Sequence, residues 1–318
     1  MRTKHVLLIG VSFLALVLGA LFWPRSNGRT VRMAYPPIIP SLPVFVAQEN
    51  HLFEKEGVKL ETISLDSSND LVNALVAGQA DLLPAVSLVP IVHLEIRHPG
   101  KVRILSHSLM NPSNALDKVL VKEGSPIRTL QDLQGKKIGL FPGTAPQKMF
   151  ITFLKKHGVR AESVSFVQLA PAAQLASLES GAVDALFSYE PVTTTALVHG
   201  GYRTLIGSVY ADLLNPCPIG VSVISRDFER KNAALAARSV RVLQEGIQFM
   251  AAHPQEARTL LPKFTKIKPE IAARVNVSDV TLQNEVDVHN LQQFIDLLYD
   301  SGEIPQRIDA HRLVDSSR

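Results

Sequence analysis

The sequence of 318 residues has almost no cysteine, because Cys217 is the only one. A single cysteine cannot form an intrachain disulfide, so the hydrophobic core alone has to stabilise the fold. No histidine or basic residue stands near it in Asn215-Pro216-Cys217-Pro218, so nothing there suggests a lowered thiol pKa. We therefore predict a small packed thiol rather than a nucleophile.

Charge is also sparse. Charged residues make up 19% of the chain, and the net charge of +4 is spread along it without a stripe of lysine, arginine and interleaved aromatic residues. Surfaces that bind nucleic acid use such stripes, so we expect no nucleic-acid partner. Hydrophobic residues reach 46%, which supplies the cores of two ordinary domains at this length and argues against a disordered chain.

The common catalytic motifs are missing as well. The chain has no G-x-S-x-G elbow, no Walker A loop, no H-E-x-x-H pair and no G-x-G-x-x-G run after a strand. The ten histidines are scattered, and His93 and His98 have no partner at metal-ligand spacing, so surface histidines are expected. We predict no catalytic residue, no metal site and no cofactor.

An apolar segment stands near the N-terminus. Residues Val6 to Trp23 are uncharged, about long enough to cross a bilayer as a helix, and preceded by Arg2 and Lys4. The stretch before Pro24 offers no clear small-x-small cleavage site, so a cleaved signal peptide and an uncleaved anchor both stay open. Residues 1–29 are assigned to this segment and its linker. We expect a periplasmic protein, secreted by cleavage or tethered to the inner membrane by residues 6–23.

The rest of the chain contains an internal duplication. The first unit reads as a strand from Val31 to Tyr35, a helix over Val44–Phe53, a stop at Gly57 and a second strand at 58–63. The second unit repeats this order, with a strand at 137–141, a helix through Leu154, a stop at Gly158 and a strand at 164–167. Each is a β-α-β unit.

A second matched pair extends the duplication. Residues 75–81 and 178–184 both contain a helix end, a glycine and an aspartate that opens the next strand, and they lie 103 residues apart. Two matches in the same order predict two similar α/β lobes. We assign residues 30–113 and 217–318 to lobe I and 114–216 to lobe II, with the helical tail packed on lobe I. The protein is expected to be a monomer.

Ligands of parallel α/β sheets gather at the carboxyl ends of the strands. That rule selects four loops, at residues 35–41, 85–87, 141–144 and 188–191. The predicted ligand-binding residues in and near these loops are Tyr35, Ser41, Ser87, Asn111, Thr144, Tyr189, Glu190 and Asn215. Simpler roles stay open: Ser41 and Thr144 fit helix N-caps, Glu190 fits a helix dipole, and Tyr35 fits a core aromatic.

The charge of the ligand follows in part from these loops. Helix N-termini favour an anionic group, but the four loops contain no lysine or arginine, and Glu190 is present. A bare inorganic anion is therefore disfavoured. A zwitterion such as an aminosulfonate, or a neutral heteroaromatic ring with an N–H donor, fits better.

At these residues the sequence resembles the periplasmic binding proteins of ABC importers for nitrate, taurine, aliphatic sulfonates and thiamine-precursor pyrimidines. The resemblance covers about residues 31–312 and is carried by the segments Pro43–Gly57, Leu130–Gly143, Gly181–Pro191 and Leu298–Gly302. It implies a two-lobed α/β fold of the type II periplasmic-binding class, with mostly parallel sheets and a cleft between the lobes.

The resemblance also implies a function. The protein would capture a small organic solute, a sulfonate or a pyrimidine-like compound, and deliver it to an ABC permease in the inner membrane. Two features depart from the family: residues 34–37 lack the usual tryptophan and asparagine of the pyrimidine binders, and the lipoprotein cysteine is missing.

Two alternatives remain from the sequence. One is a membrane-anchored sensor, and the other is an enzyme of the pyrimidine-synthesis kind on the same fold. The enzyme would need a histidine or lysine in the cleft, and the nearest in sequence are His107 and Lys148.

Overall fold

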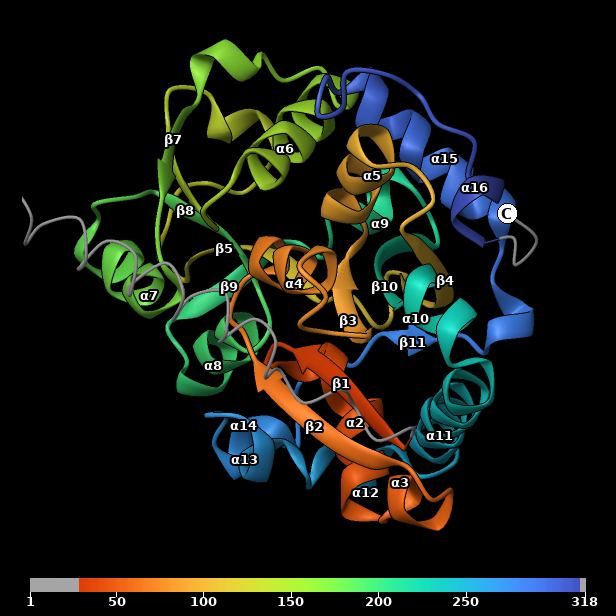
Figure 1. The fold of residues 1–318 in the computed structure, drawn as a ribbon. Coiled ribbons are helices and arrows are strands. Elements are labelled where there is room, and N and C mark those ends of the chain that lie inside the picture. Colours follow the sequence, from red (N-terminus) through yellow and green to blue (C-terminus); the bar gives the residue numbers. More distant parts are fainter. Residues whose placement is uncertain (1–28, 315–318) are drawn as a thin grey trace, which may run out of the picture.

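The computed structural model describes residues 29–314, which form two β-sheets flanked by helices (Figure 1). The predicted signal peptide or anchor lies outside the described residues. Within residues 29–314, none of the helices combines the length and hydrophobicity that crossing a bilayer demands.

The first sheet has six strands in the order β11-β4-β10-β3-β1-β2. Strand β1 runs parallel to β2 and β3, whereas β10 runs antiparallel to β3 and β4. The strands are β1 (Thr30–Tyr35), β2 (Lys59–Ser64), β3 (Leu82–Ser87), β4 (Val102–Met110), β10 (Cys217–Ser225) and β11 (Asp279–Val280).

The second sheet has five strands in the order β7-β6-β8-β5-β9. Strand β6 runs parallel to β7 and β8, whereas β5 runs antiparallel to β8 and β9. The strands are β5 (Asp117–Lys122), β6 (Lys137–Leu140), β7 (Ser165–Gln168), β8 (Ala185–Tyr189) and β9 (Tyr202–Ile206). The order β2-β1-β3-β10 in the first sheet matches β7-β6-β8-β5 in the second, which confirms the predicted duplication.

The repeated aspartate has the same task in both halves. Asp81 accepts a hydrogen bond from the backbone N–H of Arg32 on β1 at 2.9 Å, and its own N–H donates to the Arg32 carbonyl at 2.8 Å. Asp184 exchanges the same two bonds with Lys137 on β6, both at 2.8 Å. Each aspartate therefore ties the start of the third strand of a unit to its first strand.

The helices follow the predicted order, with one difference. The expected helix over 44–53 is broken into α2 and α3, because His51 has a left-handed backbone with φ of 53°. The helices between the strands are α2 (Leu42–Glu49), α3 (Leu52–Lys55), α4 (Ser68–Val76), α5 (Leu88–Arg97), α6 (Thr144–Lys156), α7 (Pro171–Ser180), α8 (Val192–His199) and α9 (Tyr210–Leu213). Short 3-10 turns stand at 39–41, 131–133, 161–163 and 283–285.

The tail after β10 is helical. It contains α10 (Arg226–Lys231), α11 (Ala233–Ala252), α12 (Pro254–Arg258), α13 (Leu261–Phe264), α14 (Pro269–Ala272), α15 (Val288–Asp300) and α16 (His311–Val314). Helix α11 packs on α2, α15 lies against β10, and α16 lies against β4. We call the part built on the first sheet the first lobe and the part built on the second sheet the second lobe. Their boundaries at 113/114 and 216/217 stay a prediction.

The chain crosses between the sheets twice, after β4 and again before β10. The two crossings are joined by Asp117, whose carboxylate accepts from the Ser208 hydroxyl and from the Val209 N–H, both at 2.6 Å. Asp117 is fully buried, and burial raises its pKa to about 6. These bonds hold the crossings against each other where the lobes meet.

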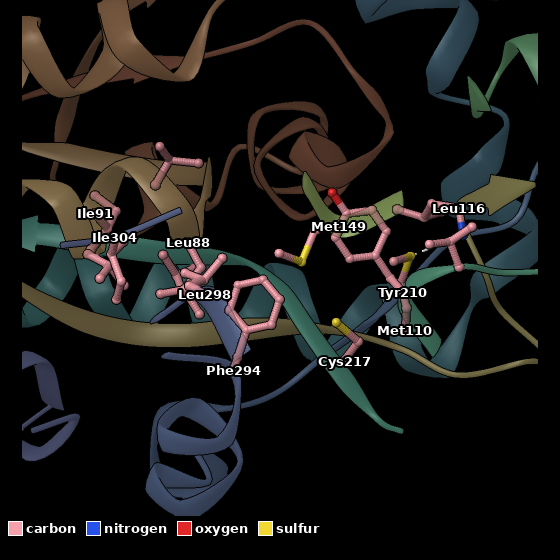
Figure 2. Packing of buried hydrophobic residues seen from close by; sticks show 14 of the residues in the cluster. Leu88, Ile91, Met110, Leu116, Met149, Tyr210, Cys217, Phe294, Leu298 and Ile304 are labelled. Carbon is pink, nitrogen blue, oxygen red and sulfur yellow. Dashed lines mark hydrogen bonds between the residues drawn. The ribbon is translucent and has the colours of Figure 1, made fainter. Parts of the chain in front are cut away.

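One hydrophobic cluster extends through both lobes. It includes Leu88 of the first lobe, Met149 and Tyr210 of the second, and Phe294 and Leu298 of α15 (Figure 2). The tail reaches the second lobe beyond this cluster, because α14 contacts α8 and the segment after α15 contacts α6 (Figure 1). The lobes are thus joined by packing as well as by the two crossings.

Candidate functional site

The four selected loops follow the carboxyl ends of parallel strands in both lobes. Tyr35 ends β1 and Ser87 ends β3 in the first sheet, while Leu140 ends β6 and Tyr189 ends β8 in the second. A helix or a 3-10 turn begins shortly after each end, so N–H groups without intrahelical partners gather there.

Two of these strand ends adjoin the crossings between the lobes. Ser87 pairs with Gly220 on β10, which pairs in turn with Ser108 on β4. In the second lobe, Tyr189 pairs with Asp117, the residue that ties the two crossings. Any rotation about the crossings therefore moves these two ends relative to each other.

The first loop of the first lobe is held by its own contacts. Ser41 is fully buried, makes no cap bond to α2, and donates from its hydroxyl to the Pro36 carbonyl at 2.6 Å. Tyr35 is half-buried, packs edge to face on Phe45 with ring centroids 5.7 Å apart, and accepts from Gln48 at 3.5 Å. Ser41 thus fixes the shape of the loop, and the hydroxyl of Tyr35 is directed to Gln48 of α2.

Ser87 has a free hydroxyl. It occupies the N-cap of α5 without making a side-chain cap bond, and its backbone N–H donates to the Ser68 hydroxyl at 3.2 Å. The Ser87 hydroxyl has no hydrogen-bond partner within residues 29–314, and the residue is half-buried. Ser87 is therefore able to bind a ligand.

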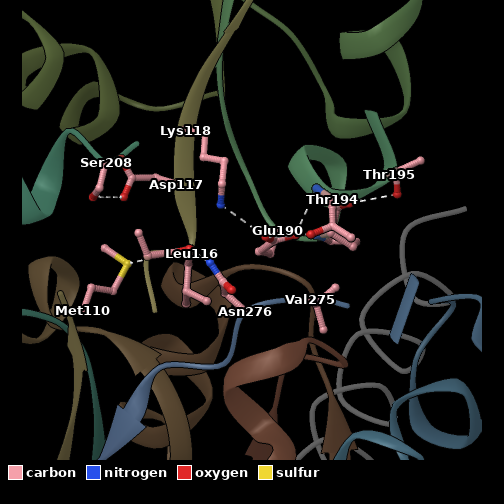
Figure 3. A network of polar contacts seen from close by, with 12 residues as sticks. Met110, Leu116, Asp117, Lys118, Glu190, Thr194, Thr195, Ser208, Val275 and Asn276 are labelled. Carbon is pink, nitrogen blue, oxygen red and sulfur yellow. Dashed lines mark hydrogen bonds and ion pairs between the residues drawn. The ribbon is translucent and has the colours of Figure 1, made fainter. Parts of the chain in front are cut away.

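Glu190 is satisfied within its own lobe. Its side chain is 2% exposed, and its two oxygens accept from the Thr194 hydroxyl at 2.9 Å and from the Thr194 N–H at 3.2 Å. The ammonium of Lys118, on β5, lies 3.6 Å away (Figure 3). Glu190 thus caps the first turn of α8, the simpler of its two predicted roles.

Lys118 is a charged residue that the sequence did not single out. It pairs across the sheet with Ser188, next to the fourth loop, and its side chain is 16% exposed. Nothing in the local sequence marks Lys118 as a site residue. It lies beside Glu190 only because β5 pairs antiparallel with β8.

Aromatic rings line the second lobe near the crossings. Tyr189 stacks edge to face with Phe141, with centroids 5.9 Å apart, and its hydroxyl lies 3.3 Å from that of Tyr210. Burial raises the pKa of the Tyr189 hydroxyl well above its usual value, so it stays neutral. Phe141 is 40% exposed, and Ile38 of the first loop is 46% exposed. The 35–41 and 141–144 loops therefore both present apolar surface.

Thr144 contacts the tail rather than capping its helix. Gly143 is the N-cap of α6 and Thr144 is the first helical residue, so the predicted N-cap position is wrong by one residue. The Thr144 hydroxyl donates to Glu303 at 3.0 Å. Glu303 also lies 3.5 Å from the ammonium of Lys148 and 3.7 Å from the ring of His93.

The two predicted asparagines stand at the two crossings between the lobes. Asn111 accepts from the Ser113 N–H at 2.8 Å, and its amide nitrogen lies 3.4 Å from the carboxylate of Asp279 on β11. Asn215 is exposed and precedes the cis proline Pro216. Within residues 29–314, neither has a hydrogen bond to a residue of the four loops.

His107 is not a surface histidine, so this expectation is wrong for that residue. It is fully buried on β4, with Nδ1 2.6 Å from the Thr281 hydroxyl and Nε2 accepting from the Asp287 N–H at 3.4 Å. Burial lowers its pKa to about 4, so the ring is neutral. The buried Cys217 thiol is confirmed, and burial raises its pKa well above its usual value. In the part of the chain that the structure describes, histidine, cysteine, aspartate and glutamate side chains form no cluster of three or more that could hold a metal ion.

The comparisons with known proteins agree with this architecture. A family model described as NMT1/THI5 like matches residues 39–257. The chain is 23% identical to a putative aliphatic sulfonates-binding protein of Escherichia coli, over 91% of this chain and 90% of the relative. It is 26% identical to the taurine-binding periplasmic protein of Escherichia coli, over 79% and 73% of the two chains.

A solved structure shows the fold directly. The periplasmic aliphatic sulphonate binding protein SsuA from Escherichia coli superposes with a TM-score of 0.75 at 21% identity, covering 90% of this chain and 97% of that one. The predicted two-lobed α/β fold of the type II periplasmic-binding class is confirmed.

Proposed function

The chain belongs to the NMT1/THI5-like family, and from that premise we propose that it is the solute-binding component of an ABC importer. It holds one small organic solute between its two lobes and performs no chemistry on it. The observation that carries this proposal is the matched pair of strand ends, β3 in the first lobe and β8 in the second, on either side of the two crossings. A solute that contacts both ends favours closure of the lobes.

The character of the loops supports an organic solute. Ile38 and Phe141 present apolar surface, the Ser87 hydroxyl is free to bond, and Lys118 supplies a partly exposed cation. Such surroundings suit a molecule with an apolar body and a polar or charged head group. Sulfonates, aminosulfonates and pyrimidine-like compounds have this form, and the relatives are named for aliphatic sulfonates and taurine.

The location and partners belong to the same proposal. The protein works in the periplasm, either free after cleavage or tethered by residues 6–23, and as a monomer. It delivers its solute to an inner-membrane ABC permease. His107 gives the enzyme alternative no support, because its ring is buried against Thr281.

A thermal-shift screen tests the proposal. The purified full-length protein is heated with small sulfonates, aminosulfonates, amino acids, pyrimidines and inorganic anions, and Tm is measured for each. A ligand present at 100 times its Kd stabilises the folded state by about 2.7 kcal/mol. We expect a rise in Tm with an organic compound of the sulfonate or pyrimidine class and none with inorganic anions. A panel that leaves Tm unchanged throughout contradicts the proposal.

A substitution in the loops locates the ligand. Phe141→Ala removes an exposed ring and is expected to weaken binding of the identified compound by about tenfold, the usual effect of losing an aromatic contact. Leu197→Ala on α8 is the matched control, because Leu197 is also 40% exposed but lies outside the four loops. Calorimetric titration gives both affinities. Equal affinities in the two variants would place the ligand elsewhere.

A further inference from the structure

Glu303 is an acidic side chain buried where the tail meets both lobes. It follows α15, and its side chain is only 5% exposed. Its neighbours come from three separate parts of the chain: His93 from α5, Thr144 and Lys148 from α6, and Gly302 from the tail itself. In Figure 1 the ends of α5, α6 and α15 lie together at this place.

The partners of Glu303 are those that an anionic ligand would use. One oxygen, Oε1, accepts from the Thr144 hydroxyl at 3.0 Å, and the other, Oε2, lies 3.5 Å from the Lys148 ammonium. Thr144 opens α6, a helix of 13 residues, so the positive end of the helix dipole points to the same place. A carboxylate of the protein therefore already occupies the position that favours an anion.

The second carboxylate oxygen of Glu303 lacks a hydrogen-bond donor. Glu303 Oε2 is buried and accepts no hydrogen bond, although Lys148 is near. The Lys148 ammonium is turned to the Gly302 carbonyl, to which it donates at 2.5 Å. The ion pair with Lys148 offsets part of the cost of burying this oxygen, and a ligand N–H group would supply the hydrogen bond that it lacks.

Access to Glu303 runs through its neighbours. Thr144 is exposed, and the side chains of Lys148 and His93 are each about one third exposed. Thr144 belongs to the 141–144 ligand loop, so a solute held by that loop comes within reach of the carboxylate. Glu190 differs, because both of its oxygens already accept hydrogen bonds from Thr194.

We propose that Glu303 sets the charge selectivity of the site, favouring solutes that bear an ammonium or another N–H donor over solutes whose only charged group is an anion. This inference rests on the proposed function. The carboxylate repels a second anion at the start of α6 and accepts a charge-assisted hydrogen bond from an amine. The selecting carboxylate is then Glu303 from the tail, not Glu190 from the fourth loop.

Matched pairs of compounds that differ only in the amine test the inference. Taurine is compared with ethanesulfonate, and β-alanine with propionate, by calorimetric titration of the full-length protein. The wild type is expected to bind the amine-bearing member of a pair more tightly. Glu303→Gln keeps the shape and removes the charge, so we expect the affinity ratio to move toward the amine-free member by about threefold or more. Lys148→Gln leaves Glu303 less neutralised and is expected to move the ratio the other way.

The opposite signs separate selectivity from a merely structural role. A loss of packing or folding weakens both members of a pair by the same factor, whereas selectivity changes their ratio. Glu54→Gln, at an exposed glutamate of α3, controls for the loss of one negative charge from the protein. An unchanged ratio in Glu303→Gln overturns the inference while the proposed function stands. If neither the wild type nor any variant binds a member of these pairs, the inference is overturned for sulfonates and carboxylates, and the thermal-shift panel decides the proposed function separately.

Discussion

Two buried titratable residues, Asp117 at the junction of the lobes and His107 in the first sheet, make the stability of the protein depend on pH. Burial raises the pKa of Asp117 to about 6, although bonds from Ser208 and Val209 act in the opposite direction. The folded protein therefore binds this proton more tightly than the unfolded chain does. The stabilisation from Asp117 is complete below about pH 4 and is lost as the pH rises through 6.

The pH dependence of Asp117→Asn provides the test. From pH 4 to pH 7, we expect the free energy of unfolding of the wild type to fall relative to that of the variant by on the order of 2–3 kcal/mol. Urea denaturation at pH 4, 5, 6 and 7 measures both proteins. A constant difference across this range would show that Asp117 does not titrate there.

His107 acts in the opposite direction within the same pH window. Because its pKa is lowered to about 4, its stabilisation is complete above the ordinary value near 6.5 and is lost as the pH falls through 4. His107 is present in both the wild type and Asp117→Asn, so its contribution cancels in their difference. Because Asp117 and His107 act in opposite directions, the free energy of unfolding of the wild type alone does not follow the pH dependence of either residue.

At the level of secondary structure, the repeated aspartates each connect two neighbouring strands. Asp81 and Asp184 each bond the backbone of the first strand of a unit, but their surroundings differ. Asp81 is buried and also pairs with the Arg32 guanidinium at 2.5 Å, whereas Asp184 is exposed. The same motif is therefore worth more in the first lobe.

Alanine substitutions at the two positions should differ accordingly. We expect Asp184→Ala to cost about 1 kcal/mol of unfolding free energy, the value of one hydrogen bond, and Asp81→Ala to cost about 3 kcal/mol or more. The larger cost arises because Asp81→Ala leaves the partly buried Arg32 guanidinium without a carboxylate partner. Denaturant titration of both variants measures the difference. Equal losses would show that the ion pair with Arg32 adds nothing.

The whole molecule is joined by one apolar cluster as well as by two chain crossings. Met149, Phe294 and Leu88 belong to different parts of the chain and share this cluster (Figure 2). A cluster that extends through both lobes couples their unfolding, since neither lobe can lose its packing without exposing apolar surface of the other. Closure then has to occur with this part of the interface intact.

Calorimetry tests this coupling. The ligand-free protein is expected to unfold in one transition whose calorimetric and van't Hoff enthalpies agree. Met149→Ala should lower Tm by roughly 5 °C and keep a single transition. Leu197→Ala, at an exposed position of the same lobe, should leave Tm nearly unchanged. Two separated transitions in the wild type would mean that the lobes fold independently.

The sequence by itself determined the alternation of strands and helices, the glycine stops and the duplication. These features depend on local chemistry: Gly57 and Gly158 have positive φ, and Asp81 and Asp184 act on neighbouring strands of their own unit. The duplication predicted two similar α/β lobes, and the type II class was implied by the family resemblance of segments such as Leu130–Gly143 and Gly181–Pro191. The four loops were also found this way, because the carboxyl end of a parallel strand can be located from its order in the chain.

Only the tertiary structure decided which side chains meet. Thr144 and Glu303 are 159 residues apart, and Lys118 meets Glu190 because β5 pairs antiparallel with β8. No local pattern encodes such contacts, since they depend on how the tail and the two lobes pack. The free energy of a charged group depends on its burial and partners, so the roles of Glu190 and Glu303 could not be assigned before the fold was known.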